Sequence, residues 1–245
     1  MKILVVGDVH GESPFMQAVF QVASQHGIAD ILQVGDFGYW PHTKWGEKFL
    51  REVETFGAAV GTTVWWIDGN HENHEWLRLK RKRPDGAVPI SEHCIHLPRG
   101  YRWDWDGVRF GALGGAFSVD WRERDPLVSW WPQEVTTYSE LVLLGEAPLD
   151  VLVTHDCPAG VELPSHWRMR VGDQEACDTQ RELLAEAVRQ TGAKMVLHGH
   201  WHHRHTSELP STPQPVRVEG LANDGCGQDS MMVLDLDELK VPHTA

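Results

Sequence analysis

Eight polar side chains with metal-binding chemistry stand just after short apolar runs of the sequence. The first run, residues 3–6, is apolar throughout and is followed by Gly7 and Asp8. The complete set is Asp8, His10, Asp36, Asn70, His71, His155, His200 and His202. In α/β sheets, ligand sites usually form at the carboxyl ends of strands, where these side chains would lie if the runs are strands. Carboxylates, imidazoles and an amide oxygen suit borderline divalent cations such as Mn²⁺, Fe²⁺ and Zn²⁺.

This set contains more ligands than a single cation needs. Two cations about 3.5–4 Å apart that share a carboxylate would use it well, because such a pair clamps a phosphoryl group and lowers the pKa of a bridging water. Asp36 is a candidate for the shared carboxylate, and a positioned histidine could protonate the leaving alkoxide. The set contains no cysteine, so the sequence gives no support for a structural zinc site of the cysteine type.

Buried strands and amphipathic helices must position these side chains. Continuous β-rich apolar runs predict strands that are buried on both faces at residues 3–6, 31–34, 64–67, 151–153 and 195–197. Helical patterns cover residues 14–26, 44–60 and 173–191. Ser13 is the predicted N-cap of the first helix, and Gly192 the predicted end of the last. Further strands are predicted at residues 108–110, 216–218 and 231–234, and loops at residues 117–132, 158–172 and 203–215. The alternation of strands and helices implies a largely parallel sheet with helices packed on it.

Five short motifs carry the candidate ligands. They are Gly7-Asp8-Val9-His10-Gly11, Gly35-Asp36, Gly69-Asn70-His71-Glu72, Thr154-His155 and Gly199-His200-Trp201-His202. Each motif alone is weakly specific, but together and in this order they resemble the signature of the calcineurin-like metallophosphoesterase superfamily, and in particular its small bacterial and phage-type members. The resemblance implies an α/β fold. It would be a four-layer sandwich of two mixed β-sheets flanked by helices, with a dinuclear metal site at the strand ends.

The resemblance also implies a role for each site residue. The ligands of one metal would be Asp8, His10 and His202. The ligands of the second would be Asn70, His155 and His200, with Asp36 bridging both ions. His71 would bind phosphate and donate the proton, and Asn70 would also bind substrate. The implied cofactors are two divalent cations, Mn²⁺ foremost, with Fe²⁺, Zn²⁺ or Ni²⁺ as alternatives. The implied reaction is hydrolysis of phosphate mono- or diesters by in-line attack of a metal-bridging hydroxide.

The second motif departs from the pattern of the serine/threonine protein phosphatases. Those enzymes continue it with a Val-Asp-Arg-Gly run whose arginine binds phosphate, whereas here Asp36 is followed by Phe37-Gly38-Tyr39-Trp40. We therefore expect small phosphodiesters or nucleotides as favoured substrates. The alternatives are a phosphomonoesterase like the serine/threonine protein phosphatases and a catalytically inactive binding scaffold. No candidate ligand is missing, which favours an enzyme over a scaffold.

Two arginines in the predicted loop of residues 117–131 could replace the missing phosphate contact. Arg122 and Arg124 stand among tryptophans, and guanidinium groups bind phosphate oxygens bidentately. We expect this loop to close over the site and one of the two arginines to hold the phosphate. The alternative is that both pair with surface acids. The tryptophans in predicted loops either pin those loops or form a stacking wall for a flat group; they are Trp103, Trp105, Trp121, Trp130, Trp131 and Trp167.

Composition bounds the remaining possibilities. The 245 residues can form one domain, 1–245, with a sizeable core. A formal net charge of −13 disfavours strong nucleic-acid binding, and therefore a nuclease, as well as anionic membranes. The cysteines form no C-x-x-C pair, which indicates free thiols in a reducing compartment. We find neither a signal-peptide core nor a membrane span and expect a cytoplasmic protein with a phosphate-ester substrate. The basic run at residues 80–83 is interpreted as the solvated end of a helix.

Overall fold

The computed structural model describes residues 1–163, 169–210 and 214–240. The strands of one sheet are β1 (Lys2–Val6), β2 (Asp30–Gln33), β3 (Thr63–Trp66), β4 (Val88–Pro89), β5 (Cys94–His96) and β12 (Met231–Asp235). Those of the other are β6 (Arg102–Trp105), β7 (Val108–Leu113), β8 (Val151–Thr154), β9 (Met195–His198), β10 (His205–Leu209) and β11 (Val216–Gly220). The α-helices are α1 (Ser13–Gln25), α2 (Lys44–Val60), α3 (His74–Arg78), α4 (Tyr138–Leu144) and α5 (Val171–Thr191).

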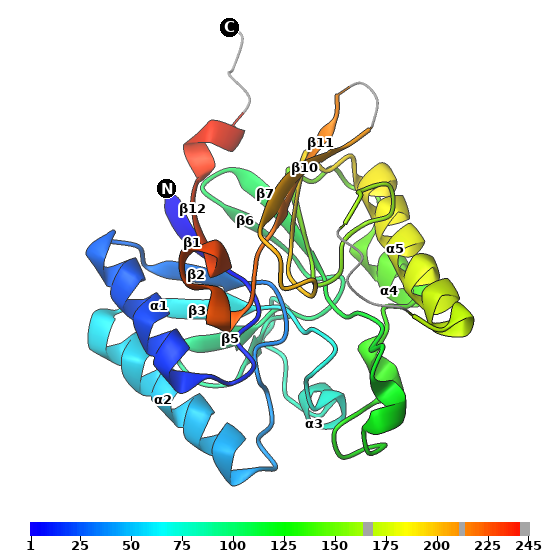
Figure 1. The fold of residues 1–245 in the computed structure, drawn as a ribbon. Coiled ribbons are helices and arrows are strands. Elements are labelled where there is room, and N and C mark those ends of the chain that lie inside the picture. Colours follow the sequence, from blue (N-terminus) through cyan, green and yellow to red (C-terminus); the bar gives the residue numbers. More distant parts are fainter. Residues whose placement is uncertain (164–168, 211–213, 241–245) are drawn as a thin grey trace, which may run out of the picture.

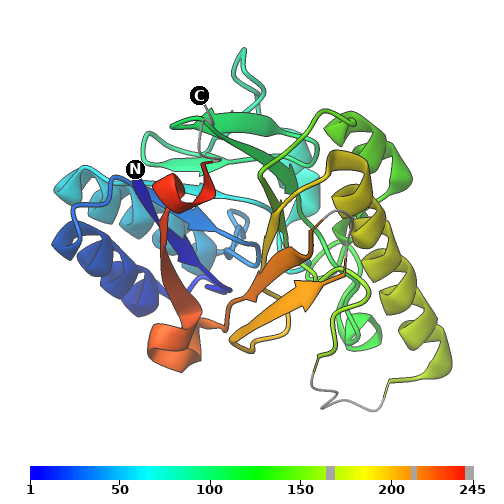
Figure 2. The ribbon, with the colours of Figure 1, turned by 90° about the horizontal axis from the view of Figure 1, so that it is seen from above.

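Within the described residues, these elements form a four-layer sandwich. Both sheets have six strands, in the orders β12-β1-β2-β3-β5-β4 and β10-β11-β9-β8-β7-β6. Helices α1 and α2 lie against the outer face of the first sheet, and α4 and α5 against that of the second (Figures 1 and 2). Each sheet is mixed, because a parallel centre is flanked by antiparallel edge strands. The predicted fold class is confirmed.

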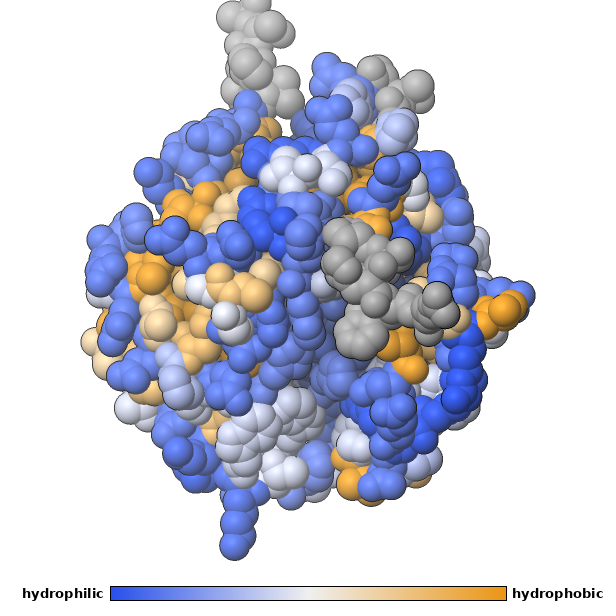
Figure 3. Space-filling model, in the orientation of Figure 1, coloured by the Kyte–Doolittle hydropathy of each residue, from blue (hydrophilic) through white to orange (hydrophobic). Residues whose placement is uncertain are grey.

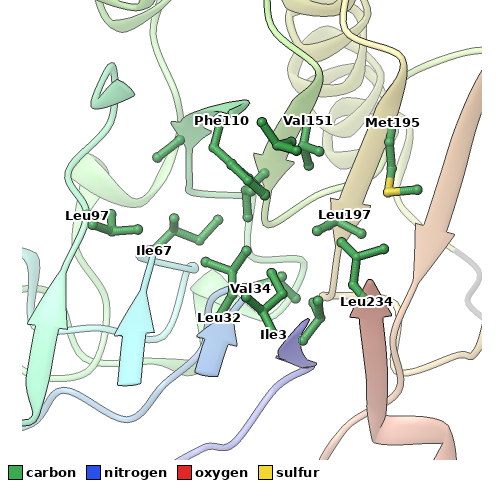
Figure 4. Packing of buried hydrophobic residues seen from close by; sticks show 14 of the residues in the cluster. Ile3, Leu32, Val34, Ile67, Leu97, Phe110, Val151, Met195, Leu197 and Leu234 are labelled. Carbon is green, nitrogen blue, oxygen red and sulfur yellow. The ribbon is translucent and has the colours of Figure 1, made fainter. Parts of the chain in front are cut away.

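The continuous apolar runs arise because the central strands are buried on both faces. In β1, Ile3 and Val5 point into the core between the two sheets, whereas Leu4 and Val6 pack beneath the helices of the first sheet. Figure 4 shows the core between the sheets, where residues of both sheets interdigitate. Burying an aliphatic side chain of this size contributes about 1.5–3 kcal/mol, so these strands are fixed firmly enough to hold a site at their ends.

Three differences from the sequence predictions concern a strand, the start of a helix and a helix cap. Strand β10 lies inside the predicted loop of residues 203–215; it is a polar edge strand that, among the described residues, pairs with β11 alone. Helix α5 begins at Val171, inside the predicted loop of residues 158–172. Ser13 is the first residue of α1 and not its cap, since Glu12 holds the N-cap position without a side-chain hydrogen bond. Residues 164–168 and 211–213 of these two predicted loops lie outside the described residues.

Two tryptophans assigned to loops are instead in a strand. Trp103 and Trp105 belong to β6 and pack on Phe110 of β7, with ring centroids 5.1 and 5.5 Å away. Their role is core packing. Trp167 lies outside the described residues. The basic run of residues 80–83 is exposed, as expected, but it follows the end of α3 and is not part of that helix.

The surface is dominated by polar side chains. Figure 3 shows a mostly hydrophilic face with apolar patches on the side where α1 lies. In the part of the chain that the structure describes, no helix combines the length and the apolar character needed to cross a membrane.

Candidate metal centre

All eight candidate site residues follow the carboxyl ends of parallel strands, and both sheets contribute. Those after β1, β2 and β3 of the first sheet are Asp8, His10, Asp36, Asn70 and His71. Those after β8 and β9 of the second sheet are His155, His200 and His202. Hydrogen bonds join the two groups directly, because the backbone nitrogen of His200 lies 3.1 Å from both carboxylate oxygens of Asp8. The structure therefore brings the predicted set together where the two sheets meet.

Asp36 lies at the centre of this arrangement. Its Oδ2 is 3.5 Å from Nε2 of His10 and 3.4 Å from Nε2 of His155, while Nε2 of His71 is 3.9 Å away. The backbone nitrogen of His71 donates a hydrogen bond to the other carboxylate oxygen, Oδ1, at 2.8 Å. Asp36 is only 1% exposed. A buried carboxylate oxygen with several imidazole nitrogens around it is a donor set that fits two divalent cations sharing one ligand.

The other candidate ligands fall into two groups near Asp36, and Asp8 forms a compact group with Asp36 and His155 as well. On one side, Nε2 of His202 lies 3.1 Å from Oδ2 of Asp8, and His10 completes a compact group with them. On the other side, Oδ1 of Asn70 lies 3.1 Å from Nε2 of His155. The ring of His200 packs edge-on against that of His155, with centroids 5.1 Å apart. The residue types on both sides can hold a cation, and the distribution of ligands between two ions stays a prediction.

The backbone at this site is strained. Four of the candidate ligands adopt a positive φ, a region that non-glycine residues seldom occupy: His10 (48°), Asp36 (54°), His200 (65°) and His202 (50°). Such strain costs about 1–3 kcal/mol per residue and clusters at functional sites. Gly199 shows how tightly the loops pack, because a Cβ atom there would overlap with Oδ1 of Asp8. The loops after the strands thus hold the candidate metal ligands in position, and their strained backbone lowers the stability of these loops.

Charge pairing decides the ionisation of the central groups. Burial opposes ionisation of Asp36, but His155 and His71 hold the pKa of its carboxyl well below the usual range. Burial also opposes protonation of His155 and His10, yet Asp36 and Asp8 outweigh it and raise the pKa of each imidazole to about 10. Without bound metal, the positive charges of the protonated histidines therefore compensate the negative charges of the buried carboxylates. Bound cations would supply this compensation instead.

Several residues that orient the candidate ligands were not identified from the sequence. Nδ1 of His155 lies 2.9 Å from the carbonyl oxygen of Val34, and Nδ1 of His10 lies 3.2 Å from Asp224. Ring nitrogens of metal-binding histidines are usually fixed in this way. Asp224 comes from a short 3-10 segment, Asp224–Ser230, far away in the sequence. An isolated acidic residue in a loop gives no pattern that would have revealed it.

Glu72 is another residue whose role in orienting the site was not identified from the sequence, although it belongs to one of the recognised motifs. Its carboxylate accepts hydrogen bonds from the backbone nitrogens of Gly69 at 2.6 Å and Phe37 at 2.7 Å, and so ties the loop after β3 to the loop after β2. Burial, followed by the charge of Asp36, raises its pKa to about 8. The fourth residue of this motif therefore shapes the backbone that carries Asp36 and Asn70.

Comparison with known proteins identifies the family. The model of the calcineurin-like phosphoesterase family matches residues 1–204 of this chain. The chain belongs to that family. No curated protein sequence matches it significantly. This family match and the polar strand ends together support a metal-binding hydrolase that acts on phosphate esters.

Solved structures agree with the family in fold. The protein TT1561 of Thermus thermophilus is 15% identical, with a TM-score of 0.58 over 98% of this chain and 96% of that one. An archaeal phosphodiesterase is also 15% identical, with a TM-score of 0.50 over the same shares of both chains. A dimetal phosphatase from Danio rerio is 12% identical, with a TM-score of 0.52 over 91% of this chain and 88% of that one.

The two arginines of this phosphoesterase occupy different surroundings. Nη1 of Arg122 lies 2.8 and 2.6 Å from the two carboxylate oxygens of Asp173, and its guanidinium stacks over Trp121 at 4.4 Å. Arg124 is 11% exposed, and its Nη1 donates to the hydroxyl of Ser118 at 2.9 Å. Because Ser118 also binds Asn70, Arg124 borders the candidate metal centre, whereas Arg122 is engaged by an acidic residue of α5.

A cavity of about 500 Å³ in the described part of the phosphoesterase is not lined by any of the candidate ligands. Its wall includes Asp68, His96 and Arg99, which form a buried charge cluster. Arg99 donates to Oδ2 of Asp68 at 2.7 Å and to the carbonyl oxygens of Glu134 and Val135 at 2.8 Å each. This cluster anchors the start of the loop after β3, which carries Asn70 and His71, to the segment before α4.

Proposed function

We propose that this chain hydrolyses small phosphodiesters or nucleotides at a two-metal centre built around Asp36. The observation that carries the proposal is the position of Oδ2 of Asp36, 3.5 Å from Nε2 of His10 and 3.4 Å from Nε2 of His155. One carboxylate oxygen thus lies near an imidazole nitrogen of each proposed ligand set. The cations would be held by Asp8, His10 and His202 on one side and by Asn70, His155 and His200 on the other, with Asp36 shared.

The bound cations would supply Lewis-acid charge and activate a water that attacks phosphorus in line with the leaving oxygen. The chain itself would supply the leaving-group proton from His71. Burial lowers the pKa of His71 despite Asp36, and Arg124 adds to the lowering. The free imidazole is therefore neutral at pH 7. A bound phosphate ester would favour the protonated form, which can donate to the leaving alkoxide.

Arg124 is the favoured replacement for the arginine missing after Asp36. Its guanidinium lies beside Ser118 and close enough to His71 to affect the pKa of that imidazole. Arg122 would have to give up its pairing with Asp173 before it could reach a phosphate. We therefore assign phosphate binding to Asn70, His71 and Arg124, and regard Arg122 as a structural residue of the loop.

The preference for small substrates rests on the residues around Asp36 and on charge. A formal net charge of −13 disfavours acidic phosphopeptide surfaces, and the residues Phe37-Gly38-Tyr39 replace the phosphate-binding run of the protein phosphatases. The likeness to a phosphodiesterase and to a dimetal phosphatase concerns the fold and does not choose between ester classes. Mn²⁺ is the proposed metal, because the site offers carboxylate, imidazole and amide ligands without a thiol.

A substrate screen tests this proposal. The purified protein, loaded with Mn²⁺, would be assayed against aryl phosphate monoesters and diesters, cyclic nucleotides and phosphopeptides. An Asp36→Asn variant purified in the same way controls for contaminating phosphatases. We expect the largest kcat/KM for a diester or a nucleotide and none in the variant. A much larger kcat/KM for a phosphopeptide would overturn the substrate class. Absence of any turnover by the metal-loaded protein would favour a binding scaffold.

A further inference from the structure

A second cluster of potential metal ligands shares no residue with the candidate centre and contains a thiol. Cys157 follows β8, His198 ends β9 and His205 begins β10. One ligand atom from each lies within 4.8 Å of the other two. The side chains of Cys157 and His198 are fully buried and His205 is partly buried, so the cluster borders the protein surface.

The two imidazoles present the nitrogens that a cation would need. Nδ1 of His198 lies 2.9 Å from the carbonyl oxygen of Gly199, which can only accept a hydrogen bond. Nδ1 therefore carries a proton, and in the neutral ring Nε2 is the atom that could bind a cation. That Nε2 lies 3.0 Å from Nε2 of His205, whose own Nδ1 is fixed by the hydroxyl of Ser207 at 2.9 Å. In each ring Nδ1 is thus held by a protein group, as is usual for metal-binding histidines, and a cation would replace the hydrogen bond between the two Nε2 atoms.

The separation of the two imidazole nitrogens is close to that found at tetrahedral zinc. Zn–N bonds of about 2.0–2.1 Å place two coordinating nitrogens about 3.3 Å apart, close to the separation of the two Nε2 atoms. The thiol of Cys157 lies within 4.8 Å of a ring nitrogen of each histidine, so a cation between the rings would be within its reach. The backbone approaches these rings so closely that a Cβ atom at Gly220 of β11 would overlap with the ring of His205. The rings are thus confined in this geometry.

We propose that Cys157, His198 and His205 form a separate zinc site, with water in the fourth position. One thiolate and two imidazoles are a ligand set that Zn²⁺ prefers, in contrast to the set around Asp36, which contains no thiol. Binding would displace the thiol proton of Cys157 to solvent. The site goes beyond the proposed hydrolysis and does not depend on it. It would give one of the cysteines, interpreted from the sequence as plain free thiols, a role in metal binding.

Such an ion would hold the turn that carries two candidate ligands of the main centre. His198 and His205 bracket residues 199–204, and this turn includes His200 and His202, both with positive φ. The loop after β8 is already tied to the turn, because Asp156 accepts a hydrogen bond from Nε1 of Trp201 at 2.8 Å. Zinc would add a second tie through Cys157, next to Asp156. Its role would be structural, since it would fix the strained turn before substrate binds.

Cobalt substitution tests the site with a signal that the main centre cannot give. A thiolate bound to Co²⁺ produces a charge-transfer absorption in the near ultraviolet, and no residue of the main set is a cysteine. The full-length protein saturated with Co²⁺ should show this band. It should remain in Cys226→Ser, the matched control for an exposed thiol, and disappear in Cys157→Ser. Elemental analysis should find one zinc ion fewer per chain in Cys157→Ser than in the wild type.

Two further variants keep the test decisive. His205→Asn should also lose the band, and serves if Cys157→Ser does not fold. Asp36→Asn should retain it, which separates this site from the proposed function. A cobalt-saturated wild type without the band, or a band unchanged in Cys157→Ser, would overturn the proposal; the two histidines would then simply share a proton between their Nε2 atoms.

Discussion

The side-chain amide of Asn70 donates a hydrogen bond to the hydroxyl oxygen of Ser118 at 2.9 Å. Ser118 is fixed in turn, because its hydroxyl donates to Oε2 of Glu134 at 2.8 Å and its backbone nitrogen donates to Oε1 at 2.9 Å. With Nδ2 engaged on this side, Oδ1 of Asn70 faces Nε2 of His155, 3.1 Å away. Ser118 therefore orients the oxygen that a cation would need.

Replacing Ser118 by alanine should weaken metal binding without unfolding the protein. Loss of a partner that orients a metal ligand typically costs about 10–100-fold in metal affinity or activity. The measurement is the Mn²⁺ dissociation constant of Ser118→Ala, with Ser118→Thr expected to restore most of the affinity because it keeps the hydroxyl. Ser139→Ala, at an exposed position of α4, is the matched control. Equal affinities for Ser118→Ala and the wild type would exclude this role.

Asp36→Ala should lose the metals on both sides of the centre together. The reason is that Oδ2 of Asp36 lies about equally close to His10 and His155, so that its loss removes a shared ligand. His202→Ala removes a ligand from one side only and should retain the other ion. Elemental analysis of the dialysed proteins decides the matter. Retention of one tightly bound ion in Asp36→Ala made in the Cys157→Ser background, which removes the other proposed site, would show that the carboxylate does not bridge.

His71→Ala should keep its metals and lose rate. As a general acid, His71 would contribute about 10²–10⁴-fold for an alkyl phosphate ester. The loss should be much smaller for an aryl ester whose leaving group needs no proton. Since His71 must be protonated to act, kcat for alkyl esters should fall as the pH rises, and this limb should flatten in the variant. Parallel pH profiles, or loss of metal from His71→Ala, would contradict the assignment.

Metal binding should release about two protons per chain near neutral pH. The pKa of His10 and of His155 is raised to about 10 in the metal-free protein, so both imidazoles are protonated, whereas a metal ligand must be neutral. Because these values are raised, the stabilisation from the His–Asp pairs is complete below about pH 6.5 and is lost as the pH rises through about 10. Metal affinity should therefore increase with pH.

Calorimetric titration with Mn²⁺ in two buffers of different ionisation enthalpy measures this release. The observed enthalpy should differ between the buffers by about twice the difference in their ionisation enthalpies. His10→Ala should release about one proton fewer. An enthalpy that does not depend on the buffer would show that the two histidines are already neutral.

The sequence predicts those parts of the fold that are buried on both sides. The run at residues 3–6 became β1 because alternate side chains enter two different cores, so every position must be apolar. Strand β10 was missed because it is a polar edge strand that is defined only by its pairing with β11. The hydrophobic pattern of a sequence indicates which elements are buried, so an element that is mostly exposed is difficult to predict from it.

The candidate site likewise contains residues that could be predicted from the sequence and residues that could not. Its ligands were identified because they follow strands and stand beside glycines in a fixed order. Ser118 and Glu134 were not, since each is an ordinary residue of a long segment between β7 and α4, and only folding places Ser118 against Asn70 and Glu134 against Ser118. The cluster of Cys157, His198 and His205 was likewise hidden, because its residues come from three separate strand ends.

Arg124→Ala should raise KM or lower kcat/KM by about tenfold or more, equivalent to about 1.4 kcal/mol, and should leave the metal content unchanged. The expected cause is loss of a phosphate contact, since Arg124 lies against Ser118 at the edge of the centre. Arg122→Ala is the matched control: it removes the same charge from the same loop, but from a guanidinium that Asp173 already engages.

Arg124 also contacts Glu134, whose pKa is raised to about 7, mainly by burial, so metal content must be measured in both variants. Unchanged metal content with wild-type kinetics in the double variant would show that this loop does not hold the phosphate. A loss confined to Arg122→Ala would mean that its bond to Asp173 opens when substrate binds.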